Sequence, residues 1–226
     1  MLKKLLSLFT VFVMLIWCYA FGEYSTELQD AYSYAYKNGI TTMNTIDKAN
    51  MEWNLTRIAM AKMIANYAIN VLWLSSFSSE SCTFSDVSSS LNSDYWNWVT
   101  NACKLWIMWQ NMWSNFRPND TVTRAEFGTA LSRTLHKAIW STLSDGTPFY
   151  TTHLNYLNTN KIMNNISDPS MLEQRWYVML MMMRAKDIVK VVDIDAGDCV
   201  AECFEVPESG QFDATEIYEC LQACVR

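Results

Sequence analysis

Apolar residues recur at helical spacing directly after a capped start at residues 123–126. Thr123 and Glu126 have the spacing of a capping box, in which a hydroxyl and a carboxylate each accept a backbone N–H at a helix start. The positions that follow form one stripe on a helix: Phe127, Ala130, Leu131 and Leu135. Pro118 favours a turn before them. The pattern predicts a helix that begins near Arg124.

The same arrangement occurs three times along the chain. An isoleucine precedes an arginine by 17, 17 and 13 residues, in the pairs Ile40 and Arg57, Ile107 and Arg124, and Ile162 and Arg175. Apolar stripes precede each isoleucine and follow each arginine at helical spacing. The chain is therefore expected to be mainly α, with helix-loop-helix repeats at residues 26–76, 82–143 and 147–188. In the third repeat, Ser170 and Glu173 have the spacing of a capping box.

Two runs in the second repeat resemble a known family. Residues 84–87 read Phe-Ser-Asp-Val, and residues 116–127 read Phe-Arg-Pro-Asn-Asp-Thr-Val-Thr-Arg-Ala-Glu-Phe. These runs, at this spacing, resemble the two ends of the S-layer homology domain, a module that holds bacterial surface proteins on the cell envelope. The resemblance implies three modules packed around a pseudo-threefold axis.

The resemblance also implies a binding role for Arg57, Arg124 and Arg175. In the family, this arginine helps to line grooves that receive an acidic, often pyruvylated, cell-wall polysaccharide. A guanidinium suits that task because it binds a carboxylate through two parallel hydrogen bonds. Asp86 is a further candidate contact, although a turn or cap role is common for such a residue. The structural alternative is that each arginine pairs with a nearby carboxylate and orders its own loop.

The N-terminus reads as an export signal. Residues 1–20 place Lys3 and Lys4 before an apolar run and then Cys-Tyr-Ala, which is the order of a secretory signal peptide. The run is shorter than the roughly 20 residues of a membrane-spanning helix, so no transmembrane span is expected in the mature chain. Cleavage after Ala20 takes the formal charge from −6 to −8. This acidic balance argues against nucleic-acid binding, which needs a basic face.

Six of the seven cysteines follow the signal and fit an oxidising compartment. Cys82 and Cys103 are expected to pair within the second repeat. In the tail, residues 192–226, two Cys-x3-Cys pairs would lie on facing helices of a hairpin, joined as Cys199–Cys224 and Cys203–Cys220. A zinc site with four thiolates is the alternative for the tail. Cys18 belongs to the signal segment.

Tryptophan is frequent where glycine is expected. The chain has ten Trp and six Gly, whereas about 7% glycine is usual. Trp106 stands where the first repeat has Gly39, and Trp73 and Trp140 follow their arginines by 16 residues, where a helix should end. We therefore hypothesise that UGA codons read as glycine were rendered as tryptophan at some of eight positions: Trp17, Trp73, Trp98, Trp106, Trp109, Trp113, Trp140 and Trp176. The alternative is a Trp-rich, sugar-stacking surface. If Trp17 is glycine, Cys18 lies in a lipoprotein-like cleavage box.

Catalysis finds little support in the sequence. His136 and His153 stand near no nucleophile motif, and His136 is expected on the exposed side of a helix end. We expect no enzyme, no cofactor and no metal. The leading function is non-covalent attachment of an exported protein to the cell wall through an acidic polysaccharide. The alternative is a secreted protein-interaction module, such as a subunit of a surface layer or of an adhesive appendage, with other surface-layer proteins as partners.

Overall fold

The structure is a computed structural model that describes residues 24–74, 82–94, 97–108, 115–138, 142–186 and 188. Several predictions concern residues outside these ranges. They are the signal peptide with Trp17 and Cys18, the cysteine hairpin at 192–226 with its two disulfides and the zinc alternative, and Trp109, Trp113 and Trp140.

The described residues are mainly helical, which confirms the predicted fold class. The helices are α2 (Thr26–Lys37), α3 (Arg57–Asn70), α4 (Ser89–Asp94), α5 (Trp98–Lys104), α6 (Arg124–Ala138), α7 (Thr151–Thr159) and α8 (Arg175–Arg184), with the short 3₁₀ helix η1 (Asp47–Ala49). Extended pairing among the described residues is limited to three isolated bridges: Asn54 with Gln174, Thr56 with Thr121, and Thr123 with Leu172.

Three helices begin at the repeated arginines, and each start is capped differently. Before α3, the Thr56 hydroxyl accepts the Ala59 N–H. Before α6, Glu126 Oε2 accepts the Thr123 N–H at 2.8 Å, and Thr123 Oγ1 accepts the Glu126 N–H at 3.3 Å.

The capping box predicted for the third repeat is wrong. Helix α8 has Gln174 as its N-cap residue, without a side-chain cap. The Ser170 hydroxyl donates instead to Asp168 Oδ1, and Glu173 is buried against Arg124. The spacing of Ser170 and Glu173 fitted a cap, but the helix begins too late for either residue to cap it.

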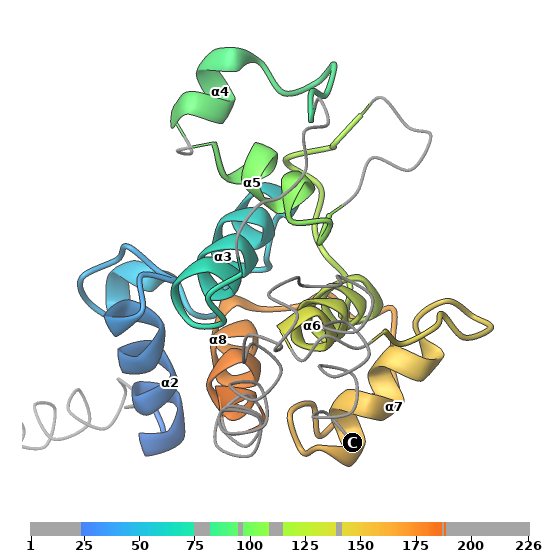
Figure 1. The fold of residues 1–226 in the computed structure, drawn as a ribbon. Coiled ribbons are helices and arrows are strands. Elements are labelled where there is room, and N and C mark those ends of the chain that lie inside the picture. Colours follow the sequence, from blue (N-terminus) through green and yellow to red (C-terminus); the bar gives the residue numbers. More distant parts are fainter. Residues whose placement is uncertain are drawn as a thin grey trace, which may run out of the picture.

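The helices pack in pairs that join different predicted repeats. Helix α2 packs on α8, α5 packs on α3, and α7 packs on α6, so Figure 1 shows three two-helix lobes around a common centre. Each pair combines the first helix of one repeat with the second helix of another. In the α6–α7 pair, Gly128 permits the close approach because a Cβ there would overlap the Leu154 side chain.

A ring of three backbone hydrogen bonds joins the lobes at the centre. The residue two positions before each arginine donates its N–H to the corresponding carbonyl of another repeat. The bonds run from Leu55 to Glu173 (2.7 Å), from Glu173 to Val122 (2.9 Å) and from Val122 to Leu55 (2.8 Å). Each of the three repeats thus gives one donor and one acceptor to the ring.

The first two N–H groups of each central helix also bond to a neighbouring repeat. Such groups have no acceptor within their own helix. The arginine N–H groups bond from Arg57 to Asp120 O (2.9 Å), from Arg124 to Met171 O (2.8 Å) and from Arg175 to Trp53 O (3.1 Å). The next N–H groups bond from Ile58 to Pro118 O, from Ala125 to Pro169 O and from Trp176 to Met51 O. The three helix starts are therefore satisfied by backbone rather than by solvent.

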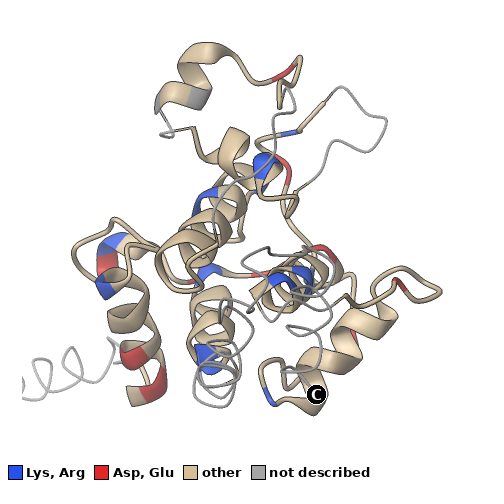
Figure 2. Ribbon diagram, viewed as in Figure 1, with Lys and Arg blue, Asp and Glu red and all other residues tan. Residues whose placement is uncertain are grey.

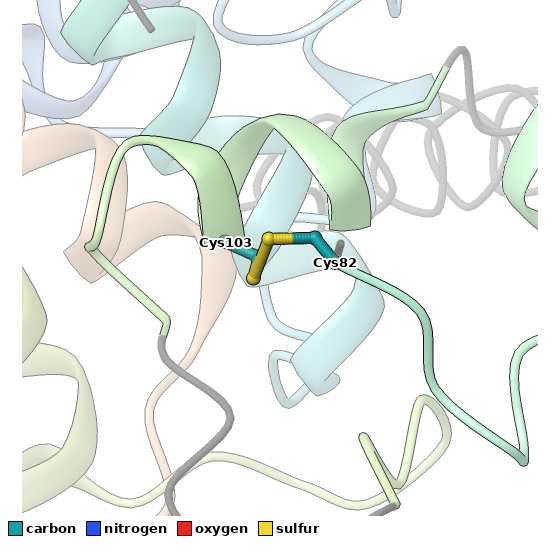
Figure 3. The surroundings of a disulfide bond; sticks show 2 residues. All are labelled: Cys82 and Cys103. Carbon is teal, nitrogen blue, oxygen red and sulfur yellow. A yellow bond between two sulfur atoms is a disulfide. The ribbon is translucent and has the colours of Figure 1, made fainter. Parts of the chain in front are cut away.

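The lobes bury one continuous apolar core. Its members include the anchoring isoleucines, Ile40, Ile107 and Ile162, and the methionine run of α8, in which Met179, Met181 and Met182 are buried. The fourth methionine of the run, Met183, is partly buried against the same core. Cys82 and Cys103 form a disulfide, with their Cα atoms 5.9 Å apart, that ties the start of the second repeat to α5 (Figure 3).

Candidate functional site

Arg57 reaches from the first repeat to the loop before α6. Its Nε donates to the Phe116 carbonyl at 2.7 Å, and its Nη1 lies 3.5 Å from Glu126 Oε1. The guanidinium also lies over the Phe116 ring, 5.3 Å from the centroid. Burial lowers the pKa of Arg57, and the Glu126 carboxylate opposes that shift. The guanidinium stays charged because its pKa starts far above neutral pH. One fifth of the side chain remains exposed.

Arg124 makes the corresponding contact to the third repeat, but it is fully enclosed. Its Nε donates to Glu173 Oε1 at 2.6 Å and its Nη1 to the Asn165 carbonyl at 2.9 Å. Its guanidinium lies over the Tyr177 ring at 4.9 Å. Only 3% of the Arg124 side chain is exposed. The predicted glycan contact at Arg124 is therefore wrong, because no ligand on the surface can reach this guanidinium.

Arg175 completes the set by reaching back to the first repeat. Its Nη1 donates to the Ala49 carbonyl at 3.3 Å, and its guanidinium lies 5.8 Å from the centroid of the Trp53 ring. All three arginines thus hold a carbonyl in the loop that precedes the central helix of a neighbouring repeat. Their common role in the structure is to join repeats, which is close to the structural alternative raised by the sequence.

Asp86 also has a structural role. Its two carboxylate oxygens accept the N–H groups of Phe116, at 2.7 Å, and of Arg117, at 2.6 Å. Phe84 packs edge-on against the Phe116 ring, 5.2 Å away. The Phe-Ser-Asp-Val run therefore fixes the loop that carries the Arg57 contact. These two bonds give Asp86 a structural role, and its contact with a glycan stays a prediction.

A groove of about 150 Å³ opens beside Arg57, where residues of the first and second repeats meet Phe149 of the third. Its lining residues are Arg57, Met60, Ile107, Met108, Glu126, Thr129, Ala130, Arg133 and Phe149. The volume is below the roughly 300 Å³ at which drug-sized ligand pockets begin, so the groove suits one small ring rather than a long segment. Of the predicted site residues, the groove contains Arg57 and Glu126.

Arg133 and Phe149 are groove residues that the sequence analysis missed. Arg133 follows Glu126 and Thr129 on α6 by seven and four residues, so these side chains share one face of the helix. That polar stripe could have marked Arg133 as a neighbour of Glu126 from the sequence alone. Phe149, 47% exposed, lies in the loop before α7 and has no periodic neighbours that would have marked it.

Asp145 holds Arg133 in place. Arg133 Nη2 lies 2.7 and 2.8 Å from the two Asp145 oxygens. Hydrogen bonds from His153 and from Arg133 lower the pKa of Asp145. Figure 2 shows basic and acidic residues interspersed over the described elements. The groove therefore holds two guanidinium groups, each beside a carboxylate: Arg57 beside Glu126 and Arg133 beside Asp145.

Ser132, His153 and Asp145 form a line of hydrogen bonds that runs from two buried side chains to the exposed Asp145. His153 Nδ1 lies 3.0 Å from Ser132 Oγ, and His153 Nε2 lies 2.9 Å from Asp145 Oδ1. The residue types match a hydrolytic triad, but Ser132 and His153 are both fully buried. A substrate carbonyl cannot reach the Ser132 hydroxyl in this arrangement. The two hydrogen bonds of His153 instead join α6 to α7 and position Asp145.

His136 does not lie on the exposed side of its helix, as the sequence had suggested. It is buried, donates from Nδ1 to the Ser132 carbonyl at 2.8 Å and packs 4.3 Å from the Tyr156 ring. Burial lowers the pKa of His136. The helical pattern gave the wrong face because α7 covers this side of α6, and that contact has no local signature.

Comparison with models of protein families finds no match, and comparison with curated proteins finds none either. The likeness to S-layer homology domains therefore rests on the residues of the chain itself. In the part of the chain that the structure describes, no helix has the length and apolar character needed to cross a membrane. Within the same ranges, His, Cys, Asp and Glu side chains form no group of three that could hold a metal ion.

Proposed function

We propose that this chain is an exported protein that attaches non-covalently to the bacterial cell envelope. It would bind an acidic cell-wall polysaccharide in the groove beside Arg57. The observation that carries the proposal is the presence of two guanidinium groups, from Arg57 and Arg133, in one small groove with the exposed Phe149 ring.

The proposed architecture is three S-layer-homology-like repeats around a pseudo-threefold axis. It is supported by the closed ring of Leu55, Val122 and Glu173, and by six further bonds that connect equivalent atoms of the repeats. The cyclic pairing of first and second helices supports the same symmetry. We extend the proposal to the segments that the structure does not describe: a signal peptide at 1–20 and a disulfide-pinned hairpin at 192–226.

The chemistry of the groove favours an acidic sugar. Charged hydrogen bonds from guanidinium to carboxylate are stronger than those between neutral groups, and the planar fork adds directional selectivity. Arg57 uses Nε for the Phe116 carbonyl and makes only a long contact to Glu126, so part of its fork faces the groove. Phe149, which is 47% exposed, gives apolar surface on which a sugar face can pack, while Met60 and Met108 line the groove as buried side chains.

A pull-down of the mature protein on purified wall sacculi tests this proposal. Arg57→Gln should weaken binding by about tenfold or more, because a charged hydrogen bond contributes about 1.5–3 kcal/mol. Arg117→Gln is the matched control, since this substitution removes the same positive charge from an exposed side chain outside the groove. Circular dichroism of both variants confirms that they are folded. Equal binding by wild type and Arg57→Gln would reject the groove as the site.

The alternative, a secreted protein-interaction module, also has one observation in its favour. Trp53, Met171 and Leu172 are large apolar residues with 61%, 42% and 38% exposure, and all three lie in the segments that approach the central ring. The same pull-down separates the two functions. Binding that survives removal of the polysaccharide from the sacculi would favour a protein partner.

A further inference from the structure

The turn after each first helix requires a left-handed residue. In each repeat, the residue before the anchoring isoleucine has a positive φ: +67° at Gly39, +58° at Trp106 and +59° at Lys161. Its N–H and that of the isoleucine both bond back to the helix. At Trp106 these bonds end on Cys103 O (2.8 Å) and, from Ile107, on Ala102 O (3.0 Å). This is the Schellman ending, at which glycine is preferred because it has no Cβ.

Trp73 has the same backbone conformation at the end of a second helix. Its φ is +55°, three residues beyond the end of α3, and the Leu74 N–H folds back to Ala68 O at 2.9 Å. The Trp73 side chain is 84% exposed. The strain of a left-handed backbone is therefore not offset by burial of the indole ring.

The Trp106 side chain is only partly enclosed. It is 40% exposed, and its ring lies 5.9 Å from the Lys137 ammonium. Lys137 already donates to the Leu105 carbonyl at 2.7 Å, so it is held without the ring. A bulky residue with positive φ is an outlier in proteins. Two of the tryptophans described here, Trp73 and Trp106, are such outliers, whereas Trp53, Trp98 and Trp176 have φ values outside the left-handed region.

We infer that residues 73 and 106 are glycine in the protein made by its own cells, and that both are encoded by UGA codons which those cells decode as glycine. The sequence points to the same answer independently, because ten tryptophans stand beside only six glycines. Glycine removes the Cβ clash with the preceding backbone at both turns and leaves every backbone hydrogen bond described above unchanged. The inference does not depend on the proposed function.

Sequencing of the gene and peptide mass spectrometry of the protein isolated from its source cells test the inference together. UGA codons at 73 and 106, with peptides that carry glycine at both positions, are the expected result. UGG codons would overturn it. UGA codons with tryptophan in the peptides would also overturn it, because some cells read UGA as tryptophan.

Recombinant variants test the physical premise separately. Starting from the chain with tryptophan at both sites, Trp73→Gly and Trp106→Gly should each raise the folding equilibrium constant by about fivefold or more, as expected for relief of a left-handed non-glycine residue. Lys161→Gly, at the third equivalent turn, should also raise the folding equilibrium constant. Lys104→Gly, at the last residue of α5, should lower the stability, because the backbone there is helical. A loss of stability at both Trp73→Gly and Trp106→Gly would contradict the premise.

Discussion

The Arg124 guanidinium lies 2.6 Å from Glu173 Oε1, and the two side chains are 3% and 1% exposed. Glu173 occupies the central-ring position at which the other two repeats have Leu55 and Val122. A charge has therefore replaced an apolar residue at the point where the three repeats meet, and the arginine of the second repeat compensates for it.

We predict that Glu173→Leu alone is strongly destabilising. The variant has the residue type found at the equivalent positions, but it removes the oxygen that accepts the Arg124 hydrogen bond, which a protonated Glu173 would still provide, and leaves the guanidinium buried without a partner side chain. The expected loss is about 3–5 kcal/mol in the free energy of unfolding. The double variant Arg124→Met/Glu173→Leu should recover most of that loss, since a well-packed apolar pair often equals a buried ion pair. Urea unfolding at pH 7 of wild type, Arg124→Met, Glu173→Leu and the double variant measures the coupling, and additive losses would contradict the pairing.

The pH dependence of stability should carry a contribution from Glu173. Burial raises the pKa of Glu173 above its usual value, and Arg124 only partly opposes the shift. The folded state then holds the proton more tightly than the unfolded state. The stabilisation is fully present below the unfolded pKa of about 4.3 and is lost as pH rises through the folded pKa. In Glu173→Gln, the free energy of unfolding should no longer fall as pH rises through this range. If the free energies of wild type and variant change in parallel with pH, the contribution of Glu173 is refuted.

Asp145 should give the opposite slope. Hydrogen bonds from His153 and Arg133 lower the pKa of Asp145. Its contribution to stability is present above the unfolded pKa of about 3.9 and is lost as pH falls through the lower folded pKa. The stability difference between wild type and Asp145→Asn should therefore shrink on acidification. Chemical unfolding at several pH values below neutrality measures this difference, and a constant value would show that Asp145 is not held by these two partners.

The Cys82–Cys103 disulfide should contribute about 3 kcal/mol to stability, because it closes a loop with a sequence separation of 21 residues. The double variant Cys82→Ser/Cys103→Ser should lose that amount in urea unfolding under non-reducing conditions. Reduction of the wild-type protein should produce the same loss at this site. An unchanged unfolding midpoint in the double variant would show that the cross-link does not constrain the unfolded chain.

The sequence predicted where α3 and α6 start, but it placed the cap of α8 too early and did not show which helices pack together. Capping residues and the repeated arginine are local signals, and α3, α6 and α8 begin at the arginines. An apolar stripe shows which face of a helix is buried without identifying the helix that covers it. The pairing of α2 with α8 therefore has no local signature.

The candidate site was predictable only in part for the same reason. The Arg57 position was visible as a repeated residue. The burial of Arg124 depends on Glu173, which is 49 residues away in the chain. The only sequence clue was a glutamate at a position that is apolar in the other repeats.

Binding of the mature protein to purified wall polysaccharide, before and after chemical removal of its acidic groups, tests the central claim most directly. Isothermal titration calorimetry should show binding to the native polysaccharide, and Arg57→Gln should weaken it by about tenfold or more. The polysaccharide without acidic groups should bind at least as weakly as the variant does. Equal affinity for the two polysaccharides would contradict recognition of an acidic glycan, and no binding to either would contradict attachment through the glycan.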